Sequence, residues 1–507
     1  MAAPPRRRIV TFLTGMRRGG ARPTGPWLAR ALFAALAAFA PLTSCAAPHA
    51  AGVQAPAASA FTPTPAQSAF LDTLEHRTFQ WFWDLSDPRT GLTPDRAPTK
   101  SFASVSATGF ALTAYPIGAE RGWVSRADAR DRTLATLRFF WASSQDTSAH
   151  ATGTHGFYYH FLDPATGARF ETVELSTIDT AWLLAGALFC QSYFDRADAG
   201  ESEVRALADS LYRRADWNWA NVRPHLIVHG WDPEHGFLEY DWRGMNESMI
   251  VPLLAIASPT HAVGSDVWSF WASGCVWGTY RGYDHVGFPP LFGHQWTACW
   301  IDLRGIRDSL MSAHDLDWFE NSRRATLAQR AYAIANPARF RGYGERCWGL
   351  TACDGPIDAT LPIDGHPRAF HTYDARGASF RAVIDDGTIA PTAAAASLPF
   401  APEVVIPALM AMRGDWGGNA YGRYGFVDAF NPTLNVPHEV PQGRIVPGVG
   451  WFDTDQLGID QGPILAMIEN YRSGLVWRVM RRNPHLLRGL RRAGFHGGWL
   501  DAAPDPR

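Results

Sequence analysis

The sequence predicts an all-α protein, a toroid in which paired helices form an inner and an outer ring. The chain has 507 residues, of which 46% are hydrophobic and 13% aromatic, as expected for a globular protein with a large core. From about residue 66, amphipathic runs of helical length alternate with connectors rich in Gly, Pro and Asp. About ten to twelve such helices, with no regular alternation with strands and no linker in the middle, favour a single large helical domain.

Nine runs carry the clearest helical pattern, and some begin with residues typical of helix caps. Ser125 precedes an acidic first turn, and Thr177 precedes another. The predicted helices cover residues 66–86, 102–119, 125–144, 175–195, 201–219, 264–280, 320–336, 402–413 and 460–482.

Between these helices the sequence predicts few strands and several long loops. The strand candidates, residues 156–162 and 226–230, are short and lie in connectors. The connectors 338–400 and 414–459 are dense in Gly, Pro and aromatic residues. Loops of this length in a compact domain usually have a function, so we expect the rim of the toroid to build a binding cleft there.

The N-terminal segment has the features of an export signal. Residues 1–44 contain seven Arg and no acidic residue, and the apolar run 31–42 is shorter than the about 20 residues that a spanning helix needs. The segment ends in Leu42-Thr43-Ser44-Cys45, which resembles the bacterial lipobox with Cys45 as the lipid-bearing residue. The alternative is an ordinary signal peptide cleaved near Ala46. Met16 is an alternative start residue.

This interpretation divides the chain into four parts. Residues 1–44 are the signal peptide, 45–65 an Ala- and Pro-rich tether, 66–490 the catalytic domain and 491–507 a C-terminal tail. We expect a monomer in the periplasm or at the outer membrane, held there by its lipid alone.

Charge and motifs exclude several classes of function. The formal net charge is −2, Lys100 is the single lysine and the arginines are scattered, so nucleic acid is a poor candidate partner. Loss of residues 1–44 removes seven of 46 basic residues and none of the 48 acidic ones, and an acidic exported protein suits a neutral polymer as substrate. The sequence contains neither a phosphate-binding loop nor a G-x-S-x-G elbow.

We also expect no metal and no cofactor. Histidines cluster twice, but their spacing matches no metalloprotease helix, and loop histidines that hydrogen-bond a substrate or each other fit the pattern better. The two clusters are His150, His155 and His160, and His225, His229 and His235.

Five cysteines follow Cys45, and two of them are close in sequence. Cys347 and Cys353 enclose five residues, so we predict a disulfide that closes a small loop after export. The alternative is two buried thiols, the usual state of Cys in an apolar interior.

Carboxylates within apolar sequence are the most informative signal, because glycosidic cleavage needs two of them in different environments. Glu174 and Asp179 adjoin a strongly apolar helix, although Asp179 also suits a helix cap. Glu320 has arginines at positions i+3 and i+4 and suits an ordinary ion pair. Glu247 has no such partner and stands beside apolar residues, so it is the best candidate for the proton donor.

Several long motifs, in order along the chain, resemble the bacterial glucoamylase-like family. This family includes endo-β-1,2-glucanases, sophorose-releasing relatives and the cyclisation domain of cyclic β-1,2-glucan synthases. The resemblance extends from about residue 70 to 480. The motifs are Asn246-Glu247-Ser248-Met249-Ile250 and residues 256–261, 319–326, 348–356, 459–464 and 468–471.

The resemblance implies an (α/α)6 toroid, hydrolysis of carbohydrate in its cleft, and Glu247 as the general acid. The second catalytic carboxylate stays open among Asp179, Glu174 and Glu320, because members of the family differ there and differ in stereochemistry. Cys353 stands where the family has Ser, and the segment 357–390 is individual to this chain.

We therefore expect an exported glycoside hydrolase acting on β-linked glucan, with β-1,2-glucan the leading substrate. The alternatives are a transglycosylase and a glycan-binding lipoprotein that has lost cleavage. Aromatic residues in connectors are candidates for stacking on sugar rings, although most Trp residues are expected in the core. The predicted substrate-binding residues are Tyr240, Trp242, Asn246, Trp296, Asp354 and Asp460, and further aromatic candidates are Phe288, Tyr421 and Trp451.

Overall fold

The computed structural model describes residues 61–505. The predicted signal peptide and Cys45 lie outside the described residues, so their outcome stays a prediction. Within residues 61–505 none of the helices combines the length and the apolar character needed to cross a membrane.

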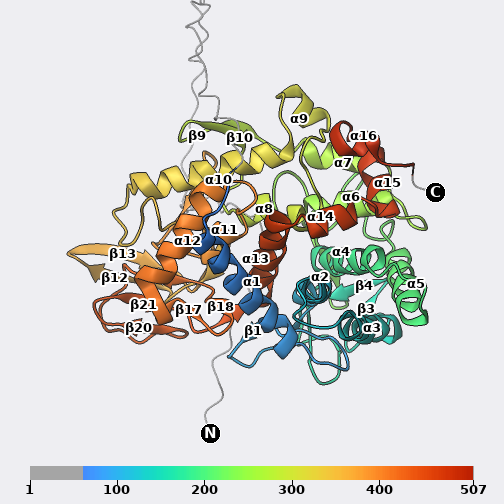
Figure 1. The fold of residues 1–507 in the computed structure, drawn as a ribbon, viewed down its shortest axis with the longest axis horizontal. Helices are drawn as coiled ribbons and strands as arrows, with labels where there is room; N and C mark the ends of the chain where they lie inside the picture. Colours follow the sequence, from blue (N-terminus) through green and yellow to red (C-terminus); the bar gives the residue numbers. More distant parts are fainter. Residues whose placement is uncertain (1–60, 506–507) are drawn as a thin grey trace, which may run out of the picture. The chain divides into compact units, whose positions relative to one another are not determined.

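Helices dominate the described part of the chain (Figure 1). They are α1 (Pro65–Leu85), α2 (Val105–Glu120), α3 (Arg126–Ala142), α4 (Thr177–Tyr193), α5 (Ala199–Arg214), α6 (Ile250–Ala257), α7 (Asp266–Ala272), α8 (Phe292–Trp300), α9 (Ser309–Ala313), α10 (Trp318–Ala335), α11 (Pro391–Ala395), α12 (Pro402–Trp416), α13 (Gly458–Arg472), α14 (Leu475–Met480), α15 (Pro484–Arg492) and α16 (Gly498–Ala502), with the 3₁₀ helices η1 (Glu247–Met249) and η2 (Gly417–Asn419).

The central helices are buried on all sides. In α2 and α4 nearly every residue is buried, and α13 is similar, whereas α5 buries five residues along one face. A helix that is apolar all round lies inside a protein, and an amphipathic helix covers it from outside. Side chains of Trp81, Trp300 and Trp477 fill the core between these helices.

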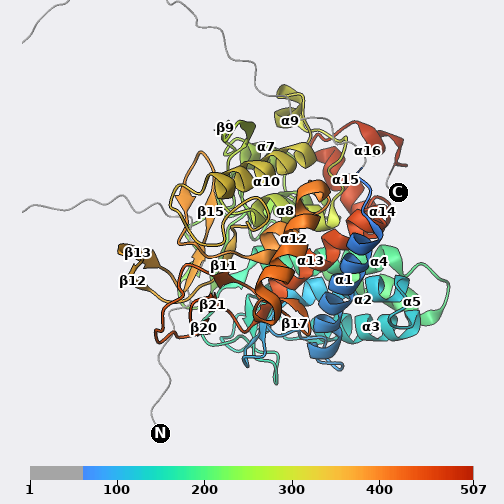
Figure 2. The same cartoon turned by 60° about the vertical axis from the view of Figure 1, so that its left-hand side comes forward.

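Contacts between the buried helices connect distant parts of the chain. Helix α2 packs against α4 and α13, α4 packs against α6, and η1 packs against α8. Gln295 of α8 donates hydrogen bonds of 2.7 Å to the Ala393 carbonyl of α11 and to Ser397 Oγ just beyond it, and α11 contacts α13. The helices α1, α3, α5, α10, α12 and α15 pack against this set, and Figure 2 shows α1 beside α13.

The connectors contain many more strands than the sequence predicted. Each strand has two to five residues, and all named pairs are antiparallel. Several pairs, such as β12 with β13, form where one connector folds back on itself. Gly365, with φ of +79°, closes the turn between β12 and β13. The prediction of few strands was therefore wrong, although the prediction that they are short is confirmed.

The longest sheet among the described residues has the strand order β3-β4-β6-β7-β8. The strands are β1 (Arg96–Ala97), β2 (Ala103–Ser104), β3 (Gly153–Thr154), β4 (Phe157–Tyr159), β5 (Phe161–Leu162), β6 (Leu175–Ser176), β7 (Gly230–Asp232), β8 (Gly236–Phe237), β9 (Trp277–Tyr280), β10 (Tyr283–Val286), β11 (Ala352–Asp354), β12 (Ala359–Ile363), β13 (His366–Phe370), β14 (Tyr373–Ala375), β15 (Gly377–Ala378), β16 (Val383–Ile384), β17 (Tyr421–Gly422), β18 (Gly425–Phe426), β19 (Phe430–Asn431), β20 (Arg444–Val446), β21 (Gly450–Phe452) and β22 (Gln456–Leu457).

Two of the nine predicted helices differ from the structure. The run 264–280 forms a helix only to Ala272, and its end forms strand β9. The run 460–482 is split into α13 and α14 by Gly474, whose φ of +67° is a conformation that Gly adopts without strain. The predicted strand at 226–230 reaches a sheet only at Gly230, and the strand at 156–162 forms β4 and β5.

The predicted domain ends also need correction. Thr64 caps α1 through a capping box with Gln67, and Phe61 packs against the core, so the fold begins inside the predicted tether. The predicted tail contains the end of α15 and all of α16, and Phe495 and Leu500 are buried in the main core.

The predicted disulfide is absent, because Cys347 and Cys353 are free, buried thiols. They belong to different apolar clusters: Cys347 packs near Trp348, and Cys353 packs with Trp451. Arg376 Nη1 lies 3.5 Å from the Cys353 sulfur. Each thiol thus has its own packing environment, and burial raises the pKa of the Cys347 thiol to about 12.

Two glycines allow α2 and α4 to approach closely, which provides a test of the packing. A Cβ atom at Gly186 would lie 2.2 Å from the Gly109 carbonyl oxygen, whereas one at Gly414 in α12 would meet nothing within 4 Å. We expect Gly186→Ala to lower the unfolding free energy by about 1–3 kcal/mol through overpacking. Gly414→Ala, the matched control, should raise it by about 0.5–1 kcal/mol. Thermal unfolding measures both, and equal effects would contradict this packing.

Candidate active site

Carboxylates gather where central helices begin. Asp179 is the third residue of α4, Asp460 is the third residue of α13, and Glu247 opens η1 just before α6. Further carboxylates come from the connectors around β1, β11, β18 and β21. The helix N-termini therefore bring residues together that are far apart in the sequence.

The first group is built around His160. Its Nδ1 lies 2.9 Å from Glu174 Oε1, and its Nε2 lies 3.6 Å from Asp179 Oδ2. Burial alone would lower the pKa of His160, but Asp179 and Glu174 raise it to about 9. Conversely, although burial opposes the change, His160 holds the pKa of Glu174 below its usual value. His160 is thus a cation between two carboxylates.

Asp179 is fixed by the cap of its own helix. Ser176, the N-cap of α4, accepts a hydrogen bond from the Asp179 N–H at 3.2 Å and donates its hydroxyl to the Asp179 carboxylate. Asp179 thus forms part of the cap, as one of the two alternatives predicted, and also faces His160 and Glu247.

Glu247 is partly exposed and forms no ion pair with any residue from 61 to 505. Burial is the main cause that raises the pKa of Glu247 to about 7, its own N–H opposes the rise, and the nearby Asp179 charge adds to it. Asn246 shapes this turn, since its Oδ1 accepts hydrogen bonds from Ser248 N at 2.9 Å and Ser248 Oγ at 2.6 Å. A carboxyl group with this pKa can carry a proton at neutral pH.

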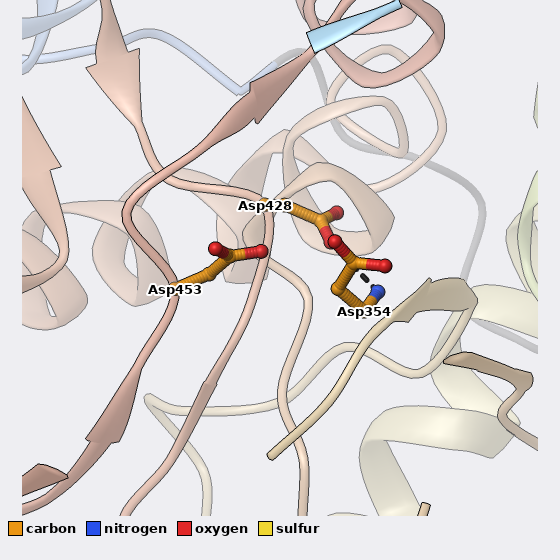
Figure 3. A group of neighbouring side chains, drawn as sticks. All are labelled: Asp354, Asp428 and Asp453. Atoms are coloured by element: carbon orange, nitrogen blue, oxygen red, sulfur yellow. Dashed lines mark hydrogen bonds between the residues drawn. The ribbon is translucent and has the colours of Figure 1, made fainter. Parts of the chain in front are cut away.

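The second group consists of four buried aspartates, which we call the aspartate quartet: Asp354, Asp428, Asp453 and Asp460. Their exposed fractions are 3%, 1%, 1% and 3%. One carboxylate oxygen each from Asp354, Asp428 and Asp453 lies within 4.8 Å of the others, and Figure 3 shows these side chains turned toward one another. The Asp354 N–H donates a hydrogen bond of 2.7 Å to Asp428 Oδ2.

Burial and repulsion between carboxylates favour the protonated form of three members of this quartet: Asp428, Asp453 and Asp460. Burial, followed by Asp460, raises the pKa of Asp428 well above its usual value. Burial, followed by Asp428 and Asp354, raises the pKa of Asp453 to about 9. Burial also raises the pKa of Asp460 to about 7, although its hydrogen bond with Asp428 opposes the rise.

Arg96 joins the two groups. It forms ion pairs with Asp95, at 3.0 Å, and with Asp354 of the quartet. Asp95 in turn raises the pKa of His160 in the first group. Strand β1, which carries Arg96, pairs with β22 just before α13, so the pairing places this cation beside the quartet.

The structure separates Glu320 from these groups. Glu320 lies on α10 and forms the predicted ion pair with Arg324 at 3.0 Å. It is therefore not among the carboxylates that the structure brings together, whereas Glu174, Asp179, Asp354 and Asp460 are.

Of the predicted aromatic binding residues, two lie beside His229 and one lies in the core. Trp242 stacks on His229 at 3.6 Å between ring centroids and donates its Nε1–H to Thr177 Oγ1 at 2.8 Å. Tyr240 is half-buried near the same histidine. Trp296 lies within α8 rather than in a connector and packs edge-on against Trp182 at 4.7 Å, which is a core position.

Sequence reasoning missed Asp95, Arg96, Asp428 and Asp453. None of them stands in a pattern that distinguishes it from a solvent-exposed loop residue. Asp428 and Asp453 do lie in the connector 414–459, whose length pointed to a function.

Comparison with known proteins shows which family this chain belongs to. Residues 239–484 match the family model Glycoamylase, described as "Putative glucoamylase". A Bacteroides uniformis protein with the same description has a crystal structure that is 30% identical, with 86% of this chain and 100% of that chain covered and a TM-score of 0.73. The chain belongs to the bacterial glucoamylase-like family. The predicted family is confirmed.

Two further members have named activities. The exo-β-1,2-glucooligosaccharide sophorohydrolase of Parabacteroides distasonis is 28% identical over 474 residues, and the match covers 86% of this chain and 59% of that protein. This chain therefore spans less than two thirds of that relative's length. The Chitinophaga pinensis endo-β-1,2-glucanase, solved with sophorotriose and glucose, is 26% identical, with 85% and 99% of the two chains covered and a TM-score of 0.73.

The charge of His160 gives a test of the first group. Its pKa is raised from the ordinary value near 6.5, so its stabilising effect is complete below about pH 6.5 and is lost as pH rises through about 9. In the wild type, His160 therefore contributes to a fall in unfolding free energy between these pH values. We expect this fall to be smaller by roughly 1–3 kcal/mol in His160→Gln. Unfolding at pH 6 and pH 9.5 measures it. The exposed His150→Gln should behave as the wild type, and an unchanged pH dependence in His160→Gln would disprove the pairing.

Proposed function

We propose that this chain is a glycoside hydrolase that cleaves β-1,2-linked glucan. The observation that carries the proposal is Glu247, a partly exposed carboxyl group without an ion pair whose pKa is raised to about 7 beside the Asp179 charge. A pair of carboxyl groups with different protonation is what glycosidic cleavage requires. Family members that act on β-1,2-glucan support the substrate class.

We infer that the fold is an (α/α)6 toroid. The support is the set of six buried helices, each in contact with others of the set and covered by outer helices: α2, α4, α6, α8, α11 and α13. The carboxylates then lie where these inner helices begin, and the connectors that follow the outer helices surround them. This arrangement explains why residues from six distant segments meet in one site.

In this proposal Glu247 donates a proton to the leaving glycosidic oxygen. Asp179 is the second carboxylate, because its charge acts on Glu247 and its own carboxylate is held by Ser176 and His160. Glu174 acts with His160 to keep that histidine charged. The charged ring of His160 in turn lies 3.6 Å from the Asp179 carboxylate.

In this proposal, residues next to these carboxylates contact the sugar rings. Trp242 and Tyr240 offer aromatic surface beside His229, and Asn246 fixes the Glu247 turn. Asp354 with Arg96 offers a charged pair that suits sugar hydroxyl groups, with Arg96 as hydrogen-bond donor and Asp354 as acceptor.

Replacing Glu247 tests the proton donor. Glu247→Gln keeps the shape but removes the transferable proton, so kcat should fall roughly 10²- to 10⁴-fold while glucan binding persists. In the wild type, kcat/KM should fall as pH rises through about 7, because the acid must be protonated. The exposed Glu345→Gln is the matched control. If Glu247→Gln kept more than about a tenth of the wild-type rate, the donor would lie elsewhere.

Products measured in the same assay separate hydrolysis from transfer. Short free oligosaccharides from β-1,2-glucan support the proposed function, whereas longer or cyclic products would indicate a transglycosylase. Binding without turnover by the wild-type protein would indicate a glycan-binding lipoprotein. A comparison of Asp179→Asn with Asp354→Asn then shows which residue is the second catalytic carboxylate. We expect the larger loss of kcat in Asp179→Asn.

We also propose that the protein is an exported lipoprotein of the periplasm or outer membrane, anchored through Cys45. Stable anchoring takes two or more acyl chains, so Cys45→Ala should release the protein from membranes into the soluble fraction. Cell fractionation with an antibody measures this, and Ser44→Ala serves as a neighbouring control. Unchanged fractionation of Cys45→Ala would disprove the lipid anchor.

A further inference from the structure

The carboxyl groups of Asp428 and Asp460 lie within hydrogen-bond reach of each other. Both side chains are at least nine-tenths buried. Each nevertheless has an oxygen that receives no hydrogen bond: Asp428 Oδ1 and Asp460 Oδ2. Two ionised carboxylates in contact, with no donor to either of these two oxygens, would repel each other strongly, because buried charges must be paired or neutralised.

The surroundings leave this pair short of positive charge. Arg96 is shared between Asp95 and Asp354, so it is engaged outside the pair. Asp453 has an unpartnered oxygen of its own, Oδ2. The titratable and charged groups facing the pair are Asp95 and Arg96 from β1, Cys353 and Asp354 from β11, Tyr373 from β14, and Asp453 after β21.

We propose that Asp428 and Asp460 share one proton, and that this carboxyl pair positions Asp354 and Arg96 at the floor of the active site. One proton turns one carboxyl into a donor for the other, and the pair then carries a single negative charge. Asp428 Oδ2 remains free to accept the Asp354 N–H at 2.7 Å, which fixes the backbone that presents Asp354 to Arg96. Asp428 and Asp460 are positioning residues, since their unpartnered oxygens are closed to solvent.

A cation is the rival explanation for the same cluster. The three oxygens of Asp354, Asp428 and Asp453 within 4.8 Å would also suit a hard divalent ion with oxygen ligands. However, Asp354 is already paired with Arg96, and Asp453 Oδ1 accepts the N–H groups of Thr454 at 2.6 Å and Asp455 at 3.1 Å. Asp460 is not one of these three residues, and its hydrogen bond with Asp428 needs a proton between the two carboxyl groups, so we favour the proton.

Infrared spectroscopy of the free protein tests the shared proton. With ¹³C-labelled aspartate at pH 7, a protonated aspartyl C=O band should be present, while Glu247 stays unlabelled. Asp428→Asn and Asp460→Asn should each remove the same component of the band, and the double variant should remove no more. Asp455→Asn, a buried neighbour whose Oδ1 accepts the Thr99 N–H, should leave the band intact. A band unchanged in either pair variant would overturn the proposal.

Adding Ca²⁺ or Mg²⁺ to the metal-free protein separates proton from cation. We expect no change in the band or in the unfolding temperature. Loss of the band with a raised unfolding temperature, seen in the wild type and absent in Asp428→Asn, would show that a cation neutralises the cluster.

The positioning role rests on the proposed function and has its own measurement. Asp428→Asn retains both an acceptor for the Asp354 N–H and a donor to Asp460, so its KM for glucan should stay close to the wild type. Asp428→Ala removes both, and should raise KM roughly tenfold with a smaller change in kcat. Equal KM values for the two variants would overturn the positioning role. A protein that shows the infrared band but cleaves no glucan would disprove the proposed function alone.

Discussion

The ion pairs of Arg96 with Asp95 and Asp354 connect the two carboxylate groups of this structure. Burying carboxylates is costly unless charge or protons compensate them. Its partner Asp95 acts on His160, which lies beside Asp179 and so near Glu247. Its other partner, Asp354, belongs to the aspartate quartet. Strand β1 is only two residues long, yet its pairing with β22 fixes this arginine beside α13. The rest of the site depends on that placement.

The central helices explain why so many acidic groups meet here. Helix N-termini present unpaired N–H groups and positive dipole ends, which favour nearby carboxylates. Asp179 and Asp460 use the first turns of α4 and α13 in this way. Close packing is the complementary requirement, since Gly109 and Gly186 let α2 and α4 meet backbone to backbone.

The sequence predicted the helical framework well because helical periodicity is a local property. Helices α1, α2, α3, α4, α5, α10 and α12 lie where the apolar runs placed them. Short elements such as β1 and α8 could not be predicted. Strand β1 forms by pairing with the distant β22, and α8 is buried on all sides, so it lacks an amphipathic pattern. The disulfide failed for the same reason: five intervening residues are compatible with a bridge, but packing places Cys347 and Cys353 in separate clusters.

The site was predictable only in part. Glu247 could be selected because no basic residue stands one turn away, and Glu174 and Asp179 because they adjoin an apolar helix. Asp428 and Asp453 could not be selected, since their importance comes from three-dimensional proximity to Asp354. His160 was grouped with two other histidines by sequence spacing, but its partners are carboxylates. Charge partners across a fold leave no trace in local sequence.

Two different pKa values give the site a defined order of proton loss. Glu247 loses its proton around pH 7, whereas His160 stays charged until about pH 9. Between these values the cation beside Asp179 persists while the proposed acid is already ionised. Loss of activity just above neutral pH therefore does not come from His160, which is still charged there, and the Glu247→Gln variant tests whether it comes from Glu247. Ionisation of Glu247 places a second negative charge near Asp179, and the charged His160, 3.6 Å from Asp179, offsets part of that repulsion throughout this range.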